Sequence, residues 1–318
     1  MKALVFKDNL EFVDNYPIPQ RNTDEALIKV KLAGICNTDR EVMKGYKDFH
    51  GVLGHEFVGV IEDANDKSLI GKRVVAEINI GCGECDFCKS GMVKHCLNRK
   101  CLGLMDKDGC FSEYITMPLN TIHFIDDDIS DEDALFTEPL AAAFSAVKDA
   151  NIQDDENILL IGDGRLSFLI YTSLVYALKG LGKDSAYIKS HVMVKGRHSD
   201  KLKLFGEATI TDDISSFKKH FDAVFEASGS DSGIDEAINC TKPRGRIIIK
   251  TTRAGKATID LNAIVVNELK LIGSRCGDFR DALMVLKTHP YLPKTEFFPL
   301  EQFKEAFDLK AFKVGFKF

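Results

Sequence analysis

Hydrophobic and polar residues alternate in short runs over the first part of the chain, up to about Thr137. Two of these runs cover residues 26–32 and 72–78, and Gly, Asn and Asp residues interrupt them. Alternation with a period of two is typical of strands that bury one face. The pattern therefore predicts a mostly β domain in this part of the chain.

A different pattern follows, in which continuous apolar runs alternate with segments that are apolar at helical spacing. It predicts strands over 157–161, 192–195, 222–226 and 245–250, and a helix over 166–178. Strands separated by helices predict a parallel, doubly wound sheet of the Rossmann type.

The segment beyond Gly277 is too short to complete a domain by itself. It contains a predicted helix over 279–288, a strand over 296–298 and a second helix over 303–307. We expect it to pack against the N-terminal part. The predicted fold class is therefore α/β, with a discontinuous, mostly β domain over 1–139 and 277–318 and a Rossmann domain over 140–276.

Composition and charge narrow the class of protein. The 318 residues are 45% hydrophobic and 28% charged, as in an ordinary globular protein. The 42 basic residues against 48 acidic ones give a net charge of −6, which argues against nucleic acid as the main partner. Residues 1–14 mix apolar and charged side chains, unlike a signal peptide or a membrane span, so we expect a cytosolic protein without a membrane partner.

Four of the nine cysteines form a C-x2-C-x2-C-x7-C array: Cys82, Cys85, Cys88 and Cys96. Four thiolates at this spacing suit a tetrahedral, closed and therefore structural Zn²⁺ site. An iron–sulfur cluster is the alternative, although the proline usual after the last cysteine is missing. Three cysteines carry no motif and are expected to be small buried residues: Cys101, Cys110 and Cys240.

Three further motifs are dispersed along the chain: Gly34-Ile-Cys-Asn-Thr-Asp39, Gly54-His-Glu56 and Thr137-Glu-Pro-Leu140. Each alone is weak evidence, because a single Cys or His is more often a packed residue than a ligand. Together, ahead of a dinucleotide-binding pattern, they strongly resemble the zinc-containing medium-chain dehydrogenase/reductase family of alcohol, polyol and threonine dehydrogenases. The resemblance covers essentially the whole chain and implies that the β domain is co-chaperonin-like.

The resemblance also implies a catalytic zinc, held by Cys36, His55 and an acidic group, with Glu56 and Glu138 both able to bind. Glu138 stands where classical alcohol dehydrogenases place a cysteine, and its Glu-Pro-Leu setting looks like the polyol and threonine dehydrogenase branch. In the family, Asp39 would orient His55. A closed structural site is the alternative, against which the carboxylate-rich ligand set argues.

The family further implies a path for the proton. Thr38 matches the hydroxyl that accepts the alcohol proton. The relay usually ends at a histidine five residues after the cysteine ligand, whereas this chain has Glu41 there. Glu41 is therefore the candidate terminal acceptor, and the departure leaves the exit route open.

The segment Gly162-Asp-Gly-Arg-Leu-Ser167 follows a predicted buried strand, which is the context of a dinucleotide-binding turn. Gly162 and Gly164 permit a tight turn and close approach to a pyrophosphate, and the helix N-terminus at Arg165 and Leu166 supplies N–H donors. Ser167 replaces the third glycine and is small enough for close packing. A plain tight turn is the alternative.

The end of the second strand bears on the choice of cofactor. An enzyme specific for NAD should carry Asp or Glu there, whereas this chain has Gly196, followed by Arg197, His198 and Lys201. Cations at these positions can bind a 2′-phosphate, which predicts NADP(H).

An extra segment over 181–190, relative to the family, complicates this interpretation. If the strand were 186–190 instead, Asp184 would lie nearby and the prediction of NADP(H) would weaken. Three more positions resemble cofactor contacts of the family: Ser228, Arg275 and Lys313. For Lys313, a solvated surface lysine is the alternative.

We therefore expect a zinc-dependent oxidoreductase that transfers hydride between NADP(H) and an alcohol, a polyol or its carbonyl form. The alternatives are a zinc-free enone or quinone reductase of the same fold, a non-catalytic binding or regulatory member, and a zinc-ribbon nucleic-acid module. The resemblance also implies a homodimer or homotetramer. The sequence does not identify the substrate.

Overall fold

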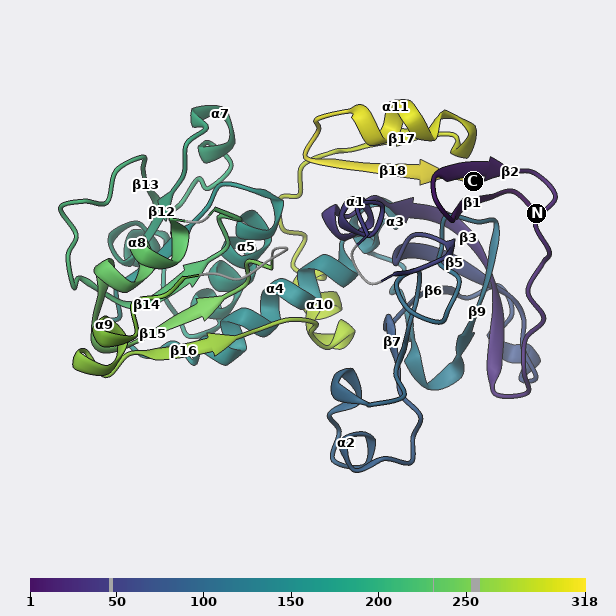
Figure 1. Ribbon diagram of the computed structural model, residues 1–318, viewed down its shortest axis with the longest axis horizontal. Coiled ribbons are helices and arrows are strands. Elements are labelled where there is room, and N and C mark those ends of the chain that lie inside the picture. Colours follow the sequence, from purple (N-terminus) through teal and green to yellow (C-terminus); the bar gives the residue numbers. More distant parts are fainter. Residues whose placement is uncertain (46–47, 231, 253–257) are drawn as a thin grey trace. The chain divides into compact units, whose positions relative to one another are not determined.

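The computed structural model describes residues 1–318 except 46–47, 231 and 253–257. The described chain divides into two compact units, one over 1–138 and 279–318 and the other over 139–278 (Figure 1). Among the described residues, no helix is both long and apolar enough to cross a membrane.

The main sheet of the first unit has the strand order β10-β6-β5-β3-β18-β17, and β9 also pairs with β3. Its strands are β3 (Glu25–Gly34), β5 (Glu56–Asp63), β6 (Arg73–Ala76), β9 (Tyr114–Pro118), β10 (Ile122–Phe124), β17 (Thr295–Phe298) and β18 (Lys313–Lys317). In β3 the side chains of Ile28, Val30 and Leu32 are buried, while Lys29 and Lys31 are exposed, as the alternating pattern predicts.

The C-terminal segment completes this sheet. Strand β18 pairs antiparallel with β3, with Gly315 opposite Gly34 and Phe316 opposite Ala33. Figure 1 shows β17 and β18 with helix α11 (Phe303–Asp308) beside them. Residues about 280 positions apart in the sequence are therefore neighbours, because β3 pairs with β5 from the N-terminal part and with β18 from the C-terminal part.

Smaller elements surround the main sheet. The strands are β1 (Ala3–Phe6), β2 (Leu10–Val13) and β4 (Gly51–Val52), which pair together, and β7 (Asn79–Ile80) with β8 (Lys100–Cys101). The helices are α1 (Asn37–Val42), α2 (Asp86–Lys89), α3 (Asp131–Ala134) and α10 (Phe279–Leu286), and α4 (Thr137–Ala150) starts in this unit and continues into the second. Short 3₁₀ helices lie at Lys67–Leu69, Val93–His95, Leu119–Thr121 and Leu300–Gln302.

The second unit contains a parallel sheet with the strand order β13-β12-β11-β14-β15-β16. The strands are β11 (Ile158–Ile161), β12 (Val192–Lys195), β13 (Thr209–Thr211), β14 (Phe221–Glu226), β15 (Thr241–Ile249) and β16 (Lys270–Gly273). The order reverses direction at β11, which is the topology predicted from the alternating strands and helices.

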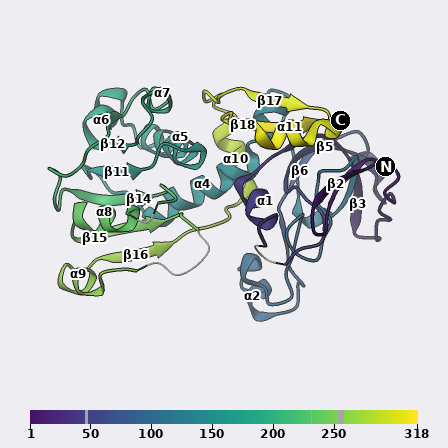
Figure 2. The ribbon, with the colours of Figure 1, turned by 45° about the horizontal axis from the view of Figure 1, so that its top comes forward.

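Helices connect these strands: α5 (Arg165–Gly180), α6 (Ser185–His191), α7 (Ser199–Leu202), α8 (Gly233–Cys240) and α9 (Leu261–Val266). Right-handed crossovers place helices on both faces of such a sheet. Figure 2 shows these helices around the strands, and residues of α8 and α9 pack into one shared core cluster. The core on the α8 side includes Leu159, Val224 and Ile247.

The second strand is β12, over Val192–Lys195, as the preferred interpretation of the sequence predicts. The alternative strand over 186–190 is wrong, because these residues belong to helix α6. Asp184 caps this helix, and its side chain accepts a hydrogen bond from the N–H of Tyr187. The side chain of Asp184 thus serves as the N-cap of a helix within the extra segment.

Candidate functional site

One buried carboxylate organises the first motif. Asp39 lies in the first turn of α1, where its Oδ2 accepts the backbone N–H of Cys36 at 2.8 Å. Its Oδ1 lies 3.1 Å from Nδ1 of His55, and both side chains are buried. Asp39 therefore positions Cys36 and His55 together and leaves Nε2 of the imidazole for a metal ion.

The pairing of β3 with β5 brings the second motif to the first. Gly34 is opposite Glu56 in this antiparallel pair, so Cys36 and His55, each just beyond its strand end, become neighbours. Ligand atoms of Cys36, His55 and Glu56 all lie within 4.8 Å of one another. Burial lowers the pKa of His55, but the neighbouring Asp39 and Cys36 outweigh it, and the net pKa lies well above its ordinary value.

Glu56 faces a buried cation from the C-terminal strand. Lys313 of β18 forms an ion pair with the Glu56 carboxylate, and both side chains are inaccessible to solvent. A Cβ atom on Gly34 would lie 2.5 Å from Oε2 of Glu56 and 2.7 Å from Cε of Lys313, so a larger residue there would displace the ends of these two side chains. Burial lowers the pKa of Lys313 to about 8, although Cys36 and Asp39 act in the opposite direction.

The burial of Lys313 contradicts one expectation. The alternative that Lys313 is a solvated surface lysine is wrong, because its side chain is fully buried beside a candidate metal ligand. Lys313 and Glu56 are far apart in the sequence, so no local pattern predicts that they pair. A role for Lys313 toward the pyrophosphate stays a prediction.

The donor set around Cys36 fits a zinc ion. A thiolate, an imidazole nitrogen and a carboxylate are all ligands that zinc accepts. Among the described residues, neither carboxylate oxygen of Glu56 makes a hydrogen bond, although both are buried. A buried charged carboxylate needs positive charge nearby, which Lys313 supplies here and to which a bound metal ion would add.

Of the remaining predicted catalytic residues, one lies beside the candidate metal ligands and two lie outside that close group. The Thr38 hydroxyl lies 3.6 Å from Sγ of Cys36, so the structure brings it to the candidate metal ligands. Glu138 lies in the first turn of α4, half-buried and outside the close group of ligand atoms, and stays a predicted ligand. Glu41 accepts a hydrogen bond from Lys44 at 2.9 Å, and in the described part of the chain none joins it to Thr38.

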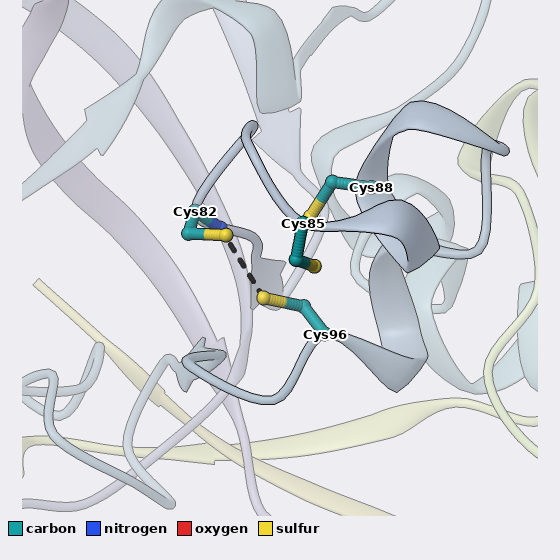
Figure 3. A group of neighbouring side chains, drawn as sticks. All are labelled: Cys82, Cys85, Cys88 and Cys96. Atoms are coloured by element: carbon teal, nitrogen blue, oxygen red, sulfur yellow. Dashed lines mark hydrogen bonds between the residues drawn. The ribbon is translucent and has the colours of Figure 1, made fainter.

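A second candidate metal centre lies in a lobe around α2 (Figure 3). Four sulfur atoms converge there, all within 4.8 Å of one another: those of Cys82, Cys85, Cys88 and Cys96. The N–H of Cys82 donates to Sγ of Cys96 at 3.4 Å. A Cβ atom on Gly81 would lie 2.7 Å from Sγ of Cys88, so the cluster depends on a glycine beside it.

The thiols of this lobe differ in acidity. Backbone N–H groups of Glu84 and Cys85 lower the pKa of Cys82 to about 6, whereas desolvation raises the pKa of Cys88 to about 12. A tetrahedral zinc site takes four thiolates and offsets the cost of deprotonating the least acidic one. The cysteines without a motif are all buried, as expected: Cys101, Cys110 and Cys240.

The candidate cofactor turn lies between β11 and α5. Gly162 has a positive φ of 125°, and a Cβ atom there would lie 2.7 Å from the carbonyl oxygen of Ala227. Gly164 caps α5, which begins at Arg165. Ser167 is buried and donates to the same Ala227 carbonyl at 3.4 Å, so a small hydroxyl residue meets the packing requirement of the third position.

A carboxylate from this turn reaches the end of the second strand. Oδ2 of Asp163 accepts the backbone N–H groups of Arg197 at 2.6 Å and of His198 at 2.8 Å, directly after Gly196. Lys201 is exposed on α7. Asp163 was missed by the sequence analysis, although its position between two glycines of the fingerprint was the available signal.

Two predicted cofactor residues lie elsewhere in the second unit. Ser228 follows β14, and its N–H and hydroxyl both donate to Oε1 of the buried Glu226, at 2.9 and 2.6 Å. Arg275 follows β16, and its carbonyl oxygen accepts from the buried Lys250 at 3.2 Å. Their contacts with a cofactor stay predictions.

Comparison with known proteins agrees with these observations. Residues 22–127 match the model of the alcohol dehydrogenase GroES-like domain, and residues 202–288 match that of the zinc-binding dehydrogenase domain. The chain belongs to the zinc-containing medium-chain dehydrogenase/reductase family. The GroES-like domain is the predicted co-chaperonin-like β domain, and the enzyme class is that of an alcohol dehydrogenase-type oxidoreductase.

Relatives within this family resemble the chain over nearly its full length. A D-arabitol-phosphate dehydrogenase of Enterococcus avium is 29% identical, with 95% of this chain and 90% of the relative covered. An erythritol/L-threitol dehydrogenase of Mycolicibacterium smegmatis is 28% identical, with coverages of 94% and 91%. The crystal structure of an alcohol dehydrogenase from Escherichia coli CFT073, in complex with NADH, superposes with a TM-score of 0.87 at 25% identity, covering 100% of this chain and 99% of that one.

Proposed function

We propose that this chain is a zinc-dependent oxidoreductase that transfers a hydride between a nicotinamide cofactor and an alcohol or polyol, or the corresponding carbonyl compound. The observation that carries the proposal is the group formed by Cys36, His55 and Glu56, which Asp39 holds in place. Two of the relatives named above are named as dehydrogenases of a polyol or a polyol phosphate, which favours the same substrate class here.

The chain's own residues would hold the metal and handle the proton. Zinc, when bound, polarises the substrate oxygen and makes its proton more acidic. Cys36 and His55 are the proposed ligands, with Glu56 or Glu138 as the acidic one. Thr38 lies beside Cys36 and is the proposed acceptor of the substrate proton. In the lobe around α2, the four cysteines would hold a second zinc ion with a structural role.

The turn at Gly162 and the start of α5 supply the cradle for the cofactor. Backbone N–H groups at a helix N-terminus stabilise a pyrophosphate, and Gly162 leaves room for close approach. The NADH complex of the Escherichia coli relative supports a nicotinamide cofactor. The preference for NADP(H) that Arg197, His198 and Lys201 predict stays a prediction, on which the carboxylate of Asp163 bears. A cytosolic location and a homodimer or homotetramer also stay predictions.

A substrate screen tests the proposal. Zinc-loaded protein is incubated with simple alcohols, polyols and polyol phosphates, each with NAD and with NADP, and the reduced nicotinamide is followed by absorbance. We expect turnover with at least one polyol-type substrate, and we expect Cys36→Ala to abolish it. Chelation of the wild type should also abolish turnover, and zinc alone should restore it. Turnover that persists in Cys36→Ala would instead favour a zinc-free reductase, and binding of cofactor without turnover would favour a non-catalytic role.

A further inference from the structure

The glycine-rich turn carries a carboxylate in contact with the second strand. β11 and β12 are parallel neighbours, with Ile161 opposite Lys195, so their C-terminal ends share one edge of the sheet. Asp163 extends from the first end to the second, where it accepts two backbone N–H groups. Nδ1 of His198 also lies 3.0 Å from its Oδ2. The carboxylate therefore stands where an acidic residue at the end of β12 would act.

Gly196 shows that only one side chain fits at this point. A Cβ atom at position 196 would lie 2.6 Å from Cβ of Asp163 and 2.7 Å from its Oδ2. An aspartate at 196 and the observed Asp163 thus exclude each other. The missing acid at the strand end is replaced by a carboxylate that occupies the same space from the neighbouring turn.

Asp163 is held in its charged form and keeps an acceptor for a ligand. Burial raises the pKa of this carboxyl, but the N–H groups of His198 and Arg197 and the His198 side chain outweigh it, so the net pKa is below its usual range. Its side chain remains 11% exposed. Among the described residues, Oδ1 has only the 3.2 Å contact with His198, so it can accept a further hydrogen bond.

The charge of Asp163 bears on which nicotinamide cofactor this edge of the sheet would accept. They differ at the 2′ oxygen of the adenosine ribose, which is a hydroxyl in NAD(H) and a phosphate in NADP(H). A hydroxyl can donate to a carboxylate, whereas a phosphate needs N–H groups or cations and is repelled by negative charge. At this turn the N–H groups of Arg197 and His198 are already bound to Asp163.

We infer that Asp163 is a specificity-determining residue: it replaces the strand-end acid, accepts a hydrogen bond from the adenosine ribose of NAD(H), and disfavours the 2′-phosphate of NADP(H). The inference rests on the proposed function, since it requires a nicotinamide cofactor at this edge of the sheet. It reverses the preference predicted from Gly196 and the cations after it, because that prediction did not include the carboxylate from the turn.

Binding titrations test the inference without any need for turnover. NADH and NADPH are titrated by fluorescence into the wild type, Asp163→Asn and Asp149→Asn. Asparagine keeps the size of Asp163 and an oxygen for the N–H groups but removes the charge. Asp149 is an exposed carboxylate on α4, so Asp149→Asn makes the same change in net charge elsewhere.

We expect the wild type and Asp149→Asn to bind NADH more tightly than NADPH. One charge-assisted hydrogen bond is worth about tenfold to a hundredfold in affinity, so Asp163→Asn should shift the NADPH/NADH ratio of dissociation constants toward NADPH by that amount. When Arg197→Ala is added to the Asp163→Asn variant, the gain in NADPH affinity should be lost. Thermal melting of each variant establishes that it is folded.

The remaining outcomes separate the inference from the proposed function. A wild type that prefers NADPH, or an unchanged ratio in folded Asp163→Asn, overturns the inference alone. If Asp163→Asn does not fold, Arg197→Ala in the wild-type background decides: the inference predicts almost no change in the ratio, and a large loss specific to NADPH contradicts it. A wild type that binds neither cofactor contradicts the proposed function itself.

Discussion

Replacement of Lys313 by methionine tests the buried ion pair beside the candidate zinc ligands. Methionine keeps most of the length of the lysine stem and removes the ammonium group. Glu56 would then be a buried carboxylate without the ammonium group that faces it from β18. We therefore expect Lys313→Met to lose stability by an amount that depends on the charge of Glu56.

The magnitude follows from the burial of both partners. Both side chains are inaccessible to solvent, and removing one member of such a pair costs about 3–5 kcal/mol, because the other charge is left without compensation. Neutralising Glu56 as well, in Lys313→Met with Glu56→Gln, should recover much of this loss. A zinc ion bound beside Glu56 supplies positive charge, so Lys313→Met should be less destabilising in zinc-loaded protein than in chelated protein.

Urea unfolding of wild type and variants, each compared under the same metal condition, measures these differences. Lys317→Met, at the exposed end of the same strand, is the matched control and should change stability by about 0.5 kcal/mol or less. Equal stability of Lys313→Met and Lys317→Met in chelated protein would mean that the buried ion pair does not stabilise the fold. So would a double variant that is no more stable than Lys313→Met alone.

Further predictions concern a proton acceptor, a close contact and a surface ion pair. Thr38→Val should leave zinc and cofactor binding intact but lower turnover by about 10²-fold, and unchanged turnover would mean that the proton leaves by another path. Gly34→Ala should cost about 1–3 kcal/mol in urea unfolding, because its Cβ would overlap buried atoms, whereas Gly206→Ala, which meets open space, should be nearly neutral. The pKa of Asp63 is lowered to about 2 by Arg21 and Lys67, so its stabilisation is complete above the ordinary carboxyl pKa and is lost as the pH falls toward 2. The stability difference between wild type and Asp63→Asn should accordingly shrink from pH 4 to pH 2, and a difference that grows with acid would contradict this sign.

Local sequence patterns were sufficient for much of the fold. The alternation in β3 and the apolar run of β11 predict these strands. A strand buried on one face alternates apolar and polar residues, and a strand buried on both faces is apolar throughout. β13 is a three-residue strand with no buried side chain, so its pairing with β12 leaves no hydrophobic signal. The spacing of the cysteine array likewise predicts a convergent group, because its members share one short loop.

Partners brought together by distant strands could not be predicted in this way. Lys313 meets Glu56 only because β3 pairs with β5 on one edge and with β18 on the other. Asp163 meets the backbone at Arg197 because β11 and β12 are parallel neighbours across a connection of about thirty residues. In both cases the side chain looks unremarkable within its own segment, and its role depends on the register of two strands.

Two separate zinc sites, one at Cys36 and one in the four-cysteine lobe, can be counted by elemental analysis of freshly purified wild type, Cys36→Ala and Cys88→Ala. We expect two zinc ions per chain in the wild type and one in each variant. Cys88→Ala should also lose thermal stability markedly, because a structural zinc contributes folding free energy. A single zinc ion per chain that persists in Cys36→Ala would exclude a zinc site at Cys36.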